Sequence, residues 1–187
     1  MGARLALGVL ILIAAGLLTG FRTDALRANW KYAGASSAGK EDGKTLAFYD
    51  AENVEYLADG NVKVWVKSVD ASEIVEIVSR DQSILKKAVD KAAQSYYPPY
   101  LLSKPEKTAS ADRYIEMIEW EEAANHAGAK PRLKRLYEIS CRERKILTSS
   151  TILYKSDGTT TYSSDFDRWS PIIPDSTGEA LEKMLCR

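Results

Sequence analysis

The segment Asn61–Val69, NVKVWVKSV, decides how this chain folds. Apolar and polar side chains alternate along it, which is the pattern of a strand with one face in the core and the other toward solvent. Val62, Val64 and Val66 share one parity, whereas Trp65 shares the other with two lysines. The alternation predicts a half-buried antiparallel strand. We expect Trp65 to pack beneath helices, which would explain an aromatic residue on a polar face.

Strand signals continue on both sides of this segment. Asp59-Gly60 directly precedes it and is a turn dipeptide of β-hairpins, and Ser156-Asp157-Gly158 repeats that signal later in the chain. The zone 28–69 as a whole has the character of strands. Further strand candidates are Thr45–Asp50 (TLAFYD), Leu133–Cys141, Leu147–Tyr154 and Thr159–Ser163.

The region between the two strand-rich zones, about 71–130, has the spacing of helices. Apolar residues recur at helical intervals in Ser83–Ser95, and Pro98-Pro99 would end that helix. A second helix is expected over Ala111–His126, capped by Ser110 and preceded by a polar connection, Lys104–Thr108. A last helix, Thr177–Leu185, would be capped by Asp175 or Ser176.

Together these elements predict an α+β fold. It would contain an antiparallel sheet of about five or six strands, helices packed on one face, a helical insertion at about 71–130, and a C-terminal helix. The chain has 187 residues, which fits a single domain over 26–187 behind a short N-terminal segment.

The first 25 residues are typical of a secretory signal peptide. Arg4 precedes the apolar run Leu5–Leu18, which has the length of a signal's hydrophobic region and is shorter than the ~20 residues of a spanning helix. Two other interpretations stay open: an uncleaved N-terminal anchor, which would be the only tie to a membrane, and a buried core helix. Export would place the domain at the cell surface, in the periplasm or in the medium.

Cys141 and Cys186 are the only two cysteines, and both lie beyond the apolar run. An even count in an oxidising compartment predicts one disulfide, which would tie the C-terminal residues to a central strand. The alternative is two reduced thiols, one of them a nucleophile. No His, Asn or Asp partner for such a nucleophile stands in a recognisable motif.

The composition excludes several functions. Lys and Arg number 26, as do Asp and Glu, so no strongly basic body indicates nucleic-acid binding. One histidine and two cysteines are too few for an ordinary zinc site, and we expect no metal and no cofactor. The sequence contains neither a phosphate-binding loop nor a G-x-S-x-G nucleophile elbow. We therefore predict a protein that is not an enzyme, with an unrecognised catalytic site as the alternative.

Two clusters could contact a partner protein. Seven basic residues crowd around the strand candidate at 133–141 and could attract an acidic partner if they share a sheet edge; a solvated strand face is the alternative. Three tyrosines around Pro98-Pro99 could be contact anchors, or they could cover the sheet as core. The basic residues are Lys130, Arg132, Lys134, Arg135, Arg142, Arg144 and Lys145, and the tyrosines are Tyr96, Tyr97 and Tyr100.

Two smaller groupings are weaker candidates. His126 lies four residues after Glu122 on one helix face, where the pair could begin a metal site, but capping or solvent exposure is favoured because nothing nearby completes it. Asp165 and Asp167 flank Phe166, and paired carboxylates can transfer protons. Their turn-rich surroundings favour a solvated loop.

Several segments, in order and spacing, resemble the bacterial surface-adhesin protein E family. They are FYD at Phe48–Asp50, VKVWVK at Val62–Lys67, YEISC at Tyr137–Cys141, RERKIL at Arg142–Leu147, Tyr154 before Asp157-Gly158, Trp169, and PDSTGEALEKMLC at Pro174–Cys186. The sequence departs from the family where an aspartate usually precedes the first cysteine, because Ser140 stands there. The helical stretch 71–130 is also longer than the family's core needs.

The resemblance implies an exported, disulfide-closed α+β domain. The best-known member of the family is a surface adhesin that binds host extracellular-matrix and serum proteins, so a matrix or envelope protein is the partner we expect; a homodimer is compatible with this. A periplasmic structural or regulatory module is the alternative function. The resemblance is better evidence for the family's fold than for its activity, because function depends on sites and not on the fold alone.

Overall fold

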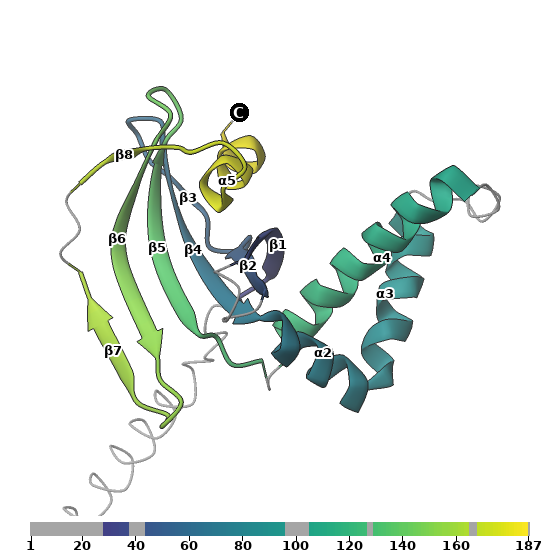
Figure 1. The fold of residues 1–187 in the computed structure, drawn as a ribbon. Coiled ribbons are helices and arrows are strands. Elements are labelled where there is room, and N and C mark those ends of the chain that lie inside the picture. Colours follow the sequence, from purple (N-terminus) through teal and green to yellow (C-terminus); the bar gives the residue numbers. More distant parts are fainter. Residues whose placement is uncertain (1–27, 38–43, 96–104, 127–128, 165–167, 187) are drawn as a thin grey trace, which may run out of the picture.

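The computed structural model describes residues 28–37, 44–95, 105–126, 129–164 and 168–186 (Figure 1). The strands are β1 (Trp30–Ser37), β2 (Lys44–Asp50), β3 (Glu55–Tyr56), β4 (Asn61–Asp70), β5 (Leu133–Ser140), β6 (Lys145–Tyr154), β7 (Thr160–Ser163) and β8 (Ser170–Pro171). The helices are α2 (Ala71–Arg80), α3 (Gln82–Ser95), α4 (Pro105–Asn125) and α5 (Thr177–Leu185).

All the strands belong to one antiparallel sheet of eight strands. Its main path runs β1-β2-β4-β5-β6-β7, while the short β3 pairs with β4 and the short β8 pairs with β6. The three helices α2, α3 and α4 follow β4 and precede β5, its neighbour in the sheet. The predicted α+β class, antiparallel sheet, helical insertion and C-terminal helix are therefore confirmed.

One face of the central strands packs against α5. The valines that alternate along β4 are 0–4% exposed, and they form one cluster with Ile139 of β5 and with Leu181 and Leu185 of α5. The alternation in the sequence thus predicted this buried face of β4. The whole cluster contains Ala33, Ala47, Val62, Val64, Val66, Ile139, Ile172, Leu181 and Leu185.

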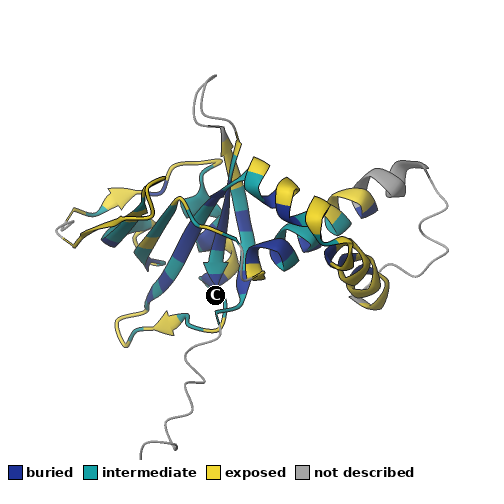
Figure 2. Ribbon diagram, turned by 90° about the horizontal axis from the view of Figure 1, so that it is seen from below, coloured by how far each residue is buried: buried dark blue, intermediate teal, exposed yellow. Residues whose placement is uncertain are grey.

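The opposite face, at the β1–β2 side of the sheet, packs against α2 and α4. Leu46 and Phe48 of β2 are fully buried there with Ile74 of α2, and Trp65 packs against the same cluster, as expected. The predicted placement of the helices on one face of the sheet is therefore wrong: α5 covers one face and α2 and α4 the other, because β2 and β4 each bury residues of both parities. Figure 2 shows this burial concentrated in the central strands and on the helix sides that face them.

The α3–α4 pair extends away from the sheet (Figure 1) and has a small core of its own, made by Ala88, Ala92 and Ile118. The predicted start of the second long helix, at Ala111 behind a connection at 104–108, is wrong. The helix α4 begins at Pro105, because proline fits the first turn of a helix, where its missing N–H costs nothing. Ser110 therefore lies inside α4 and does not cap it.

Candidate functional site

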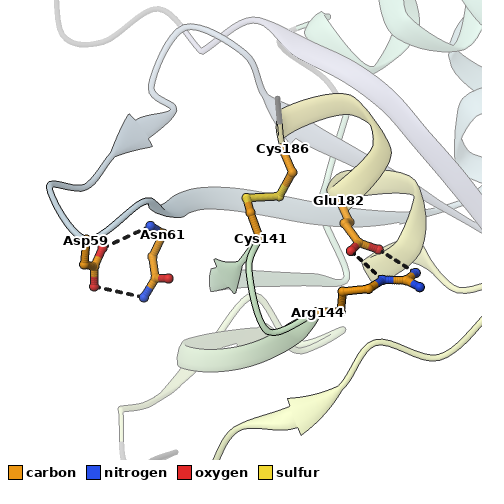
Figure 3. Close-up of a disulfide and its surroundings, with 6 residues drawn as sticks. All are labelled: Asp59, Asn61, Cys141, Arg144, Glu182 and Cys186. Atoms are coloured by element: carbon orange, nitrogen blue, oxygen red, sulfur yellow. Dashed lines mark hydrogen bonds and ion pairs between the residues drawn. A yellow bond between two sulfur atoms is a disulfide. The ribbon is translucent and has the colours of Figure 1, made fainter.

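A disulfide joins Cys141, directly after β5, to Cys186, directly after α5, with their Cα atoms 5.5 Å apart (Figure 3). The predicted pairing is confirmed. The bridge joins residues 45 positions apart in the sequence. In the chain-entropy model, a disulfide that closes a loop of that length stabilises a fold by roughly 3–4 kcal/mol. It fixes the last turn of α5 against the end of the central strands.

Three further interactions seat α5. The Ser176 hydroxyl oxygen accepts a hydrogen bond from the Glu179 backbone N–H, so Ser176 is the N-cap, one of the two residues expected. Arg144 donates two hydrogen bonds to the Glu182 carboxylate, at 2.8 and 3.0 Å (Figure 3). The Asp175 backbone N–H donates to Glu179 and lowers the pKa of that carboxyl, with Lys183 acting in the same direction.

The turn between β3 and β4 is held by its own side chains. The Asp59 carboxylate accepts hydrogen bonds from the backbone N–H and from the side-chain amide of Asn61, both over 3.0 Å (Figure 3). The same amide also donates to Glu138 of β5 over 3.0 Å. Gly60 has a φ of +83°, a conformation that glycine adopts without strain. This turn is therefore fixed to the neighbouring strand.

A hollow of about 300 Å³ opens between this turn and the end of α5. Its lining contains Tyr56, Gly60, Val62, Cys141 and Leu185. The Tyr56 side chain stands open at 61% exposure, whereas Val62 and Leu185 are buried in the core beneath. We call this region, the hollow with the turn Asp59–Asn61 and the turn Arg142–Arg144, the disulfide end.

The seven residues of the predicted basic cluster lie apart in the structure. Lys134 and Arg135 lie near the start of β5, whereas Arg142, Arg144 and Lys145 follow its other end, about 25 Å away by the rise of a strand. Nor is β5 an edge, because it lies between β4 and β6. The seven residues therefore form no single patch.

Most of these basic side chains contact a neighbouring side chain. Arg132 lies 3.6 Å from Asp70, Arg135 donates to the Tyr137 hydroxyl, and the Lys134 ammonium lies 5.5 Å from the Trp30 ring. Lys145 pairs with Glu143 and lowers the pKa of that carboxyl. Among the described residues, Arg142 is exposed and has no carboxylate within 4.0 Å.

The other candidate residues divide into two groups. Tyr96, Tyr97, Tyr100, Asp165 and Asp167 lie outside the described residues. His126 lies 3.9 Å from Asp81, while Glu122 pairs with Lys91, so the structure does not bring His126 and Glu122 together as a pair. The described part of the chain contains no group of three potential metal-ligating acids, histidines or cysteines.

Sequence reasoning missed Tyr56 and the hollow. Tyr56 precedes the Asp59-Gly60 turn signal by three positions, but no pattern in the sequence tells that the end of α5 returns to this turn. The cysteine pairing was the one available signal, since it predicted that residue 186 would lie against residue 141.

The described helices include none long and apolar enough to span a membrane. A family model described as surface-adhesin protein E matches residues 90–187, a little over half of the chain. That range contains β5–β8, α5 and both cysteines, whereas the resembling segments Phe48–Asp50 and Val62–Lys67 precede it. No curated protein and no solved structure matches the chain. By the match over 90–187, the chain belongs to the surface-adhesin protein E family.

Proposed function

We propose that this chain is an exported, surface-exposed, non-enzymatic binding domain that holds an extracellular protein at its disulfide end. Membership of a surface-adhesin family supports both the export and the binding role. The observation that carries the proposal is the hollow beside exposed Tyr56, in a region that a disulfide and two turns hold in place.

The chemistry of the hollow suits contact better than catalysis. Its five lining residues include no acid, no base and no free thiol, whereas catalytic pockets bring several polar groups together. A space of about 300 Å³ can hold one apolar side chain of a partner. Exposed tyrosines are frequent hot spots in protein interfaces, because they contribute large area with little lost freedom.

The rigidity of the disulfide end favours binding. A surface that is already ordered loses little conformational entropy when a partner docks, so more of the contact energy appears as affinity. Arg142 adds an exposed positive charge in the turn after Cys141. The partner that fits this surface presents an apolar anchor residue with acidic groups beside it.

The test is equilibrium binding of the purified protein to a panel of immobilised extracellular-matrix proteins. Tyr56→Ala and Arg142→Glu should each weaken binding to the retained panel member about tenfold or more, a loss of about 1.4 kcal/mol. Val75→Ala on α2, an apolar side chain 65% exposed against 61% for Tyr56, and Arg113→Glu on α4 are the matched controls and should bind as the unmodified protein does.

Two results would overturn the proposal: no member of the panel is retained, or the retained member binds both disulfide-end variants with unchanged affinity. Urea unfolding of each variant checks that the fold is intact, so that lost binding is not lost structure.

A further inference from the structure

The helical insertion closes one edge of the sheet. On β1, the Trp30 backbone N–H donates to the Asn125 side-chain oxygen over 2.9 Å, and the Asn125 side-chain amide donates back to the Trp30 carbonyl oxygen over 3.0 Å. The Tyr32 backbone N–H donates to the Glu121 carboxylate over 3.0 Å. Side chains of α4 thus take hydrogen bonds that another strand would otherwise make with β1.

The opposite edge, β7, has no such cover among the described residues. All four of its residues, Thr160–Ser163, are exposed, and none is charged or a proline, the residue types that protect edge strands from pairing. The edge is therefore chemically open to strand pairing.

The backbone register shows which groups of β7 face outward. The Lys155 backbone N–H donates to the Thr159 carbonyl oxygen, and hydrogen-bonded pairs alternate along an antiparallel ladder. Thr161 and Ser163 therefore direct their backbone groups toward β6, whereas Thr160 and Tyr162 direct theirs to the open side. No described residue pairs with these outward groups.

Side chains around this edge would receive a further strand. Tyr162 is 63% exposed, stands opposite Ile152 of β6 and lies 3.3 Å from the Ser150 hydroxyl. Leu153, opposite Thr161, is 42% exposed on the other face. An added strand would pack beside Tyr162 on one face and near Leu153 on the other.

We infer that the outer edge of β7 is a docking site for an extended segment of a partner protein, which adds to the sheet as a further strand. Four residues span only about 13 Å, too little edge for the ~1,200 Å² of a stable dimer, so a second copy is the poorer occupant. The uncharged edge suits an uncharged segment rich in β-branched and aromatic residues. This site is separate from the disulfide end, because β7 pairs with the far end of β6.

The test is a titration of ¹⁵N-labelled protein with a panel of extended octapeptides that alternate Val or Thr with Ser, with a terminal Lys for solubility. Thr160→Pro removes an outward N–H and leaves the β6–β7 ladder intact, whereas Thr160→Val keeps it. The same peptides with alternate backbone nitrogens methylated cannot donate along one edge, so they test the unmodified protein without any change in its folding.

Binding peptides should protect the amides of Thr160 and Tyr162 from exchange, and Thr160→Pro and backbone methylation should each weaken binding tenfold or more. Thr160→Val and Arg113→Glu on α4 should bind normally. The inference is overturned if no peptide protects these amides, or if Thr160→Pro and the methylated peptides bind normally. It is also overturned if the β7 signals respond to protein concentration alone, because the occupant would then be a second copy.

Discussion

The ammonium group of Lys67 donates a hydrogen bond over 2.6 Å to the carbonyl oxygen of Ala124, in the last turn of α4. A central strand thereby holds the end of the helical insertion, and the negative end of the helix dipole favours a cation at this place. The Trp30 ring lies 4.5 Å from the same ammonium group. Lys67 is nevertheless only 4% exposed, so its charge is costly.

This buried charge makes the stability depend on pH. Burial first, and the Lys134 ammonium second, lower the pKa of Lys67 from 10.5 to about 7. Between about pH 7 and 10.5 the unfolded chain holds the proton that the folded protein has released, so the free energy of unfolding rises with pH, by at most about 1.4 kcal/mol per unit. Below pH 7 both states are protonated, and this slope disappears.

Urea unfolding between pH 6 and 9.5 measures the effect. Lys67→Met should remove the rise above pH 7, and Lys134→Met should move its onset to higher pH because one repelling charge is gone. If Lys67→Met and the unmodified protein gave parallel curves, Lys67 would not titrate in this window.

The two hydrogen bonds between the Asn125 side chain and the Trp30 backbone, which we call the Asn125 clamp, predict that removing this side chain destabilises the fold. Asn125→Ala leaves the backbone N–H and carbonyl of Trp30 without their partner and should lower the free energy of unfolding by about 1–2 kcal/mol. Asn125→Asp keeps an acceptor for the N–H, so it should keep the Trp30 amide protected from exchange, although its carboxylate cannot donate to the Trp30 carbonyl oxygen. Amide exchange at Trp30 should rise in the alanine variant, and equal exchange in both variants would argue against the clamp.

The disulfide predicts a larger effect. Replacing Cys141 and Cys186 together by alanine should lower the free energy of unfolding by roughly 3–4 kcal/mol, because the unfolded chain regains the freedom that the closed loop removes. A reducing agent should bring the unmodified protein near to the double variant and leave that variant unchanged. An unmodified protein that loses nothing on reduction would contradict this.

Arg144 combines a favourable contact with an unfavourable backbone. Its φ of +54° lies in the left-handed region, while its side chain, 64% exposed, pairs with Glu182. Arg144→Ala loses the pair and keeps the strain, so it should lower the unfolding temperature slightly, as expected for an exposed ion pair. Arg144→Gly relieves the backbone and should recover most of that loss. Thermal unfolding compares the two variants. A glycine variant less stable than the alanine variant would show that the Arg144 backbone is not strained.

Local signals in the sequence predicted much of this fold. The valine alternation of β4, the Asp-Gly turn and the Ser176 cap each depend on neighbours within a few residues, and each is confirmed. The cysteine pairing needed only a count and a compartment.

What could not be predicted depends on distant partners. In the alternation of β4, Lys67 stands at a position expected to face solvent. It is buried because the end of α4 packs over it. Seven basic residues close in sequence suggested one patch, but they lie at opposite ends of β5. Most of them also contact a neighbouring side chain. The hollow at Tyr56 requires α5 to return to the β3–β4 turn, which no local pattern encodes.

Protease treatment of intact producing cells tests most directly whether this chain is a surface-exposed binding domain. A surface-exposed domain should be removed by a protease that cannot enter the cells, while a periplasmic control protein survives. Lysed cells provide the digestion control. Survival of the chain on intact cells, with complete digestion after lysis, would place it inside the envelope and contradict the account.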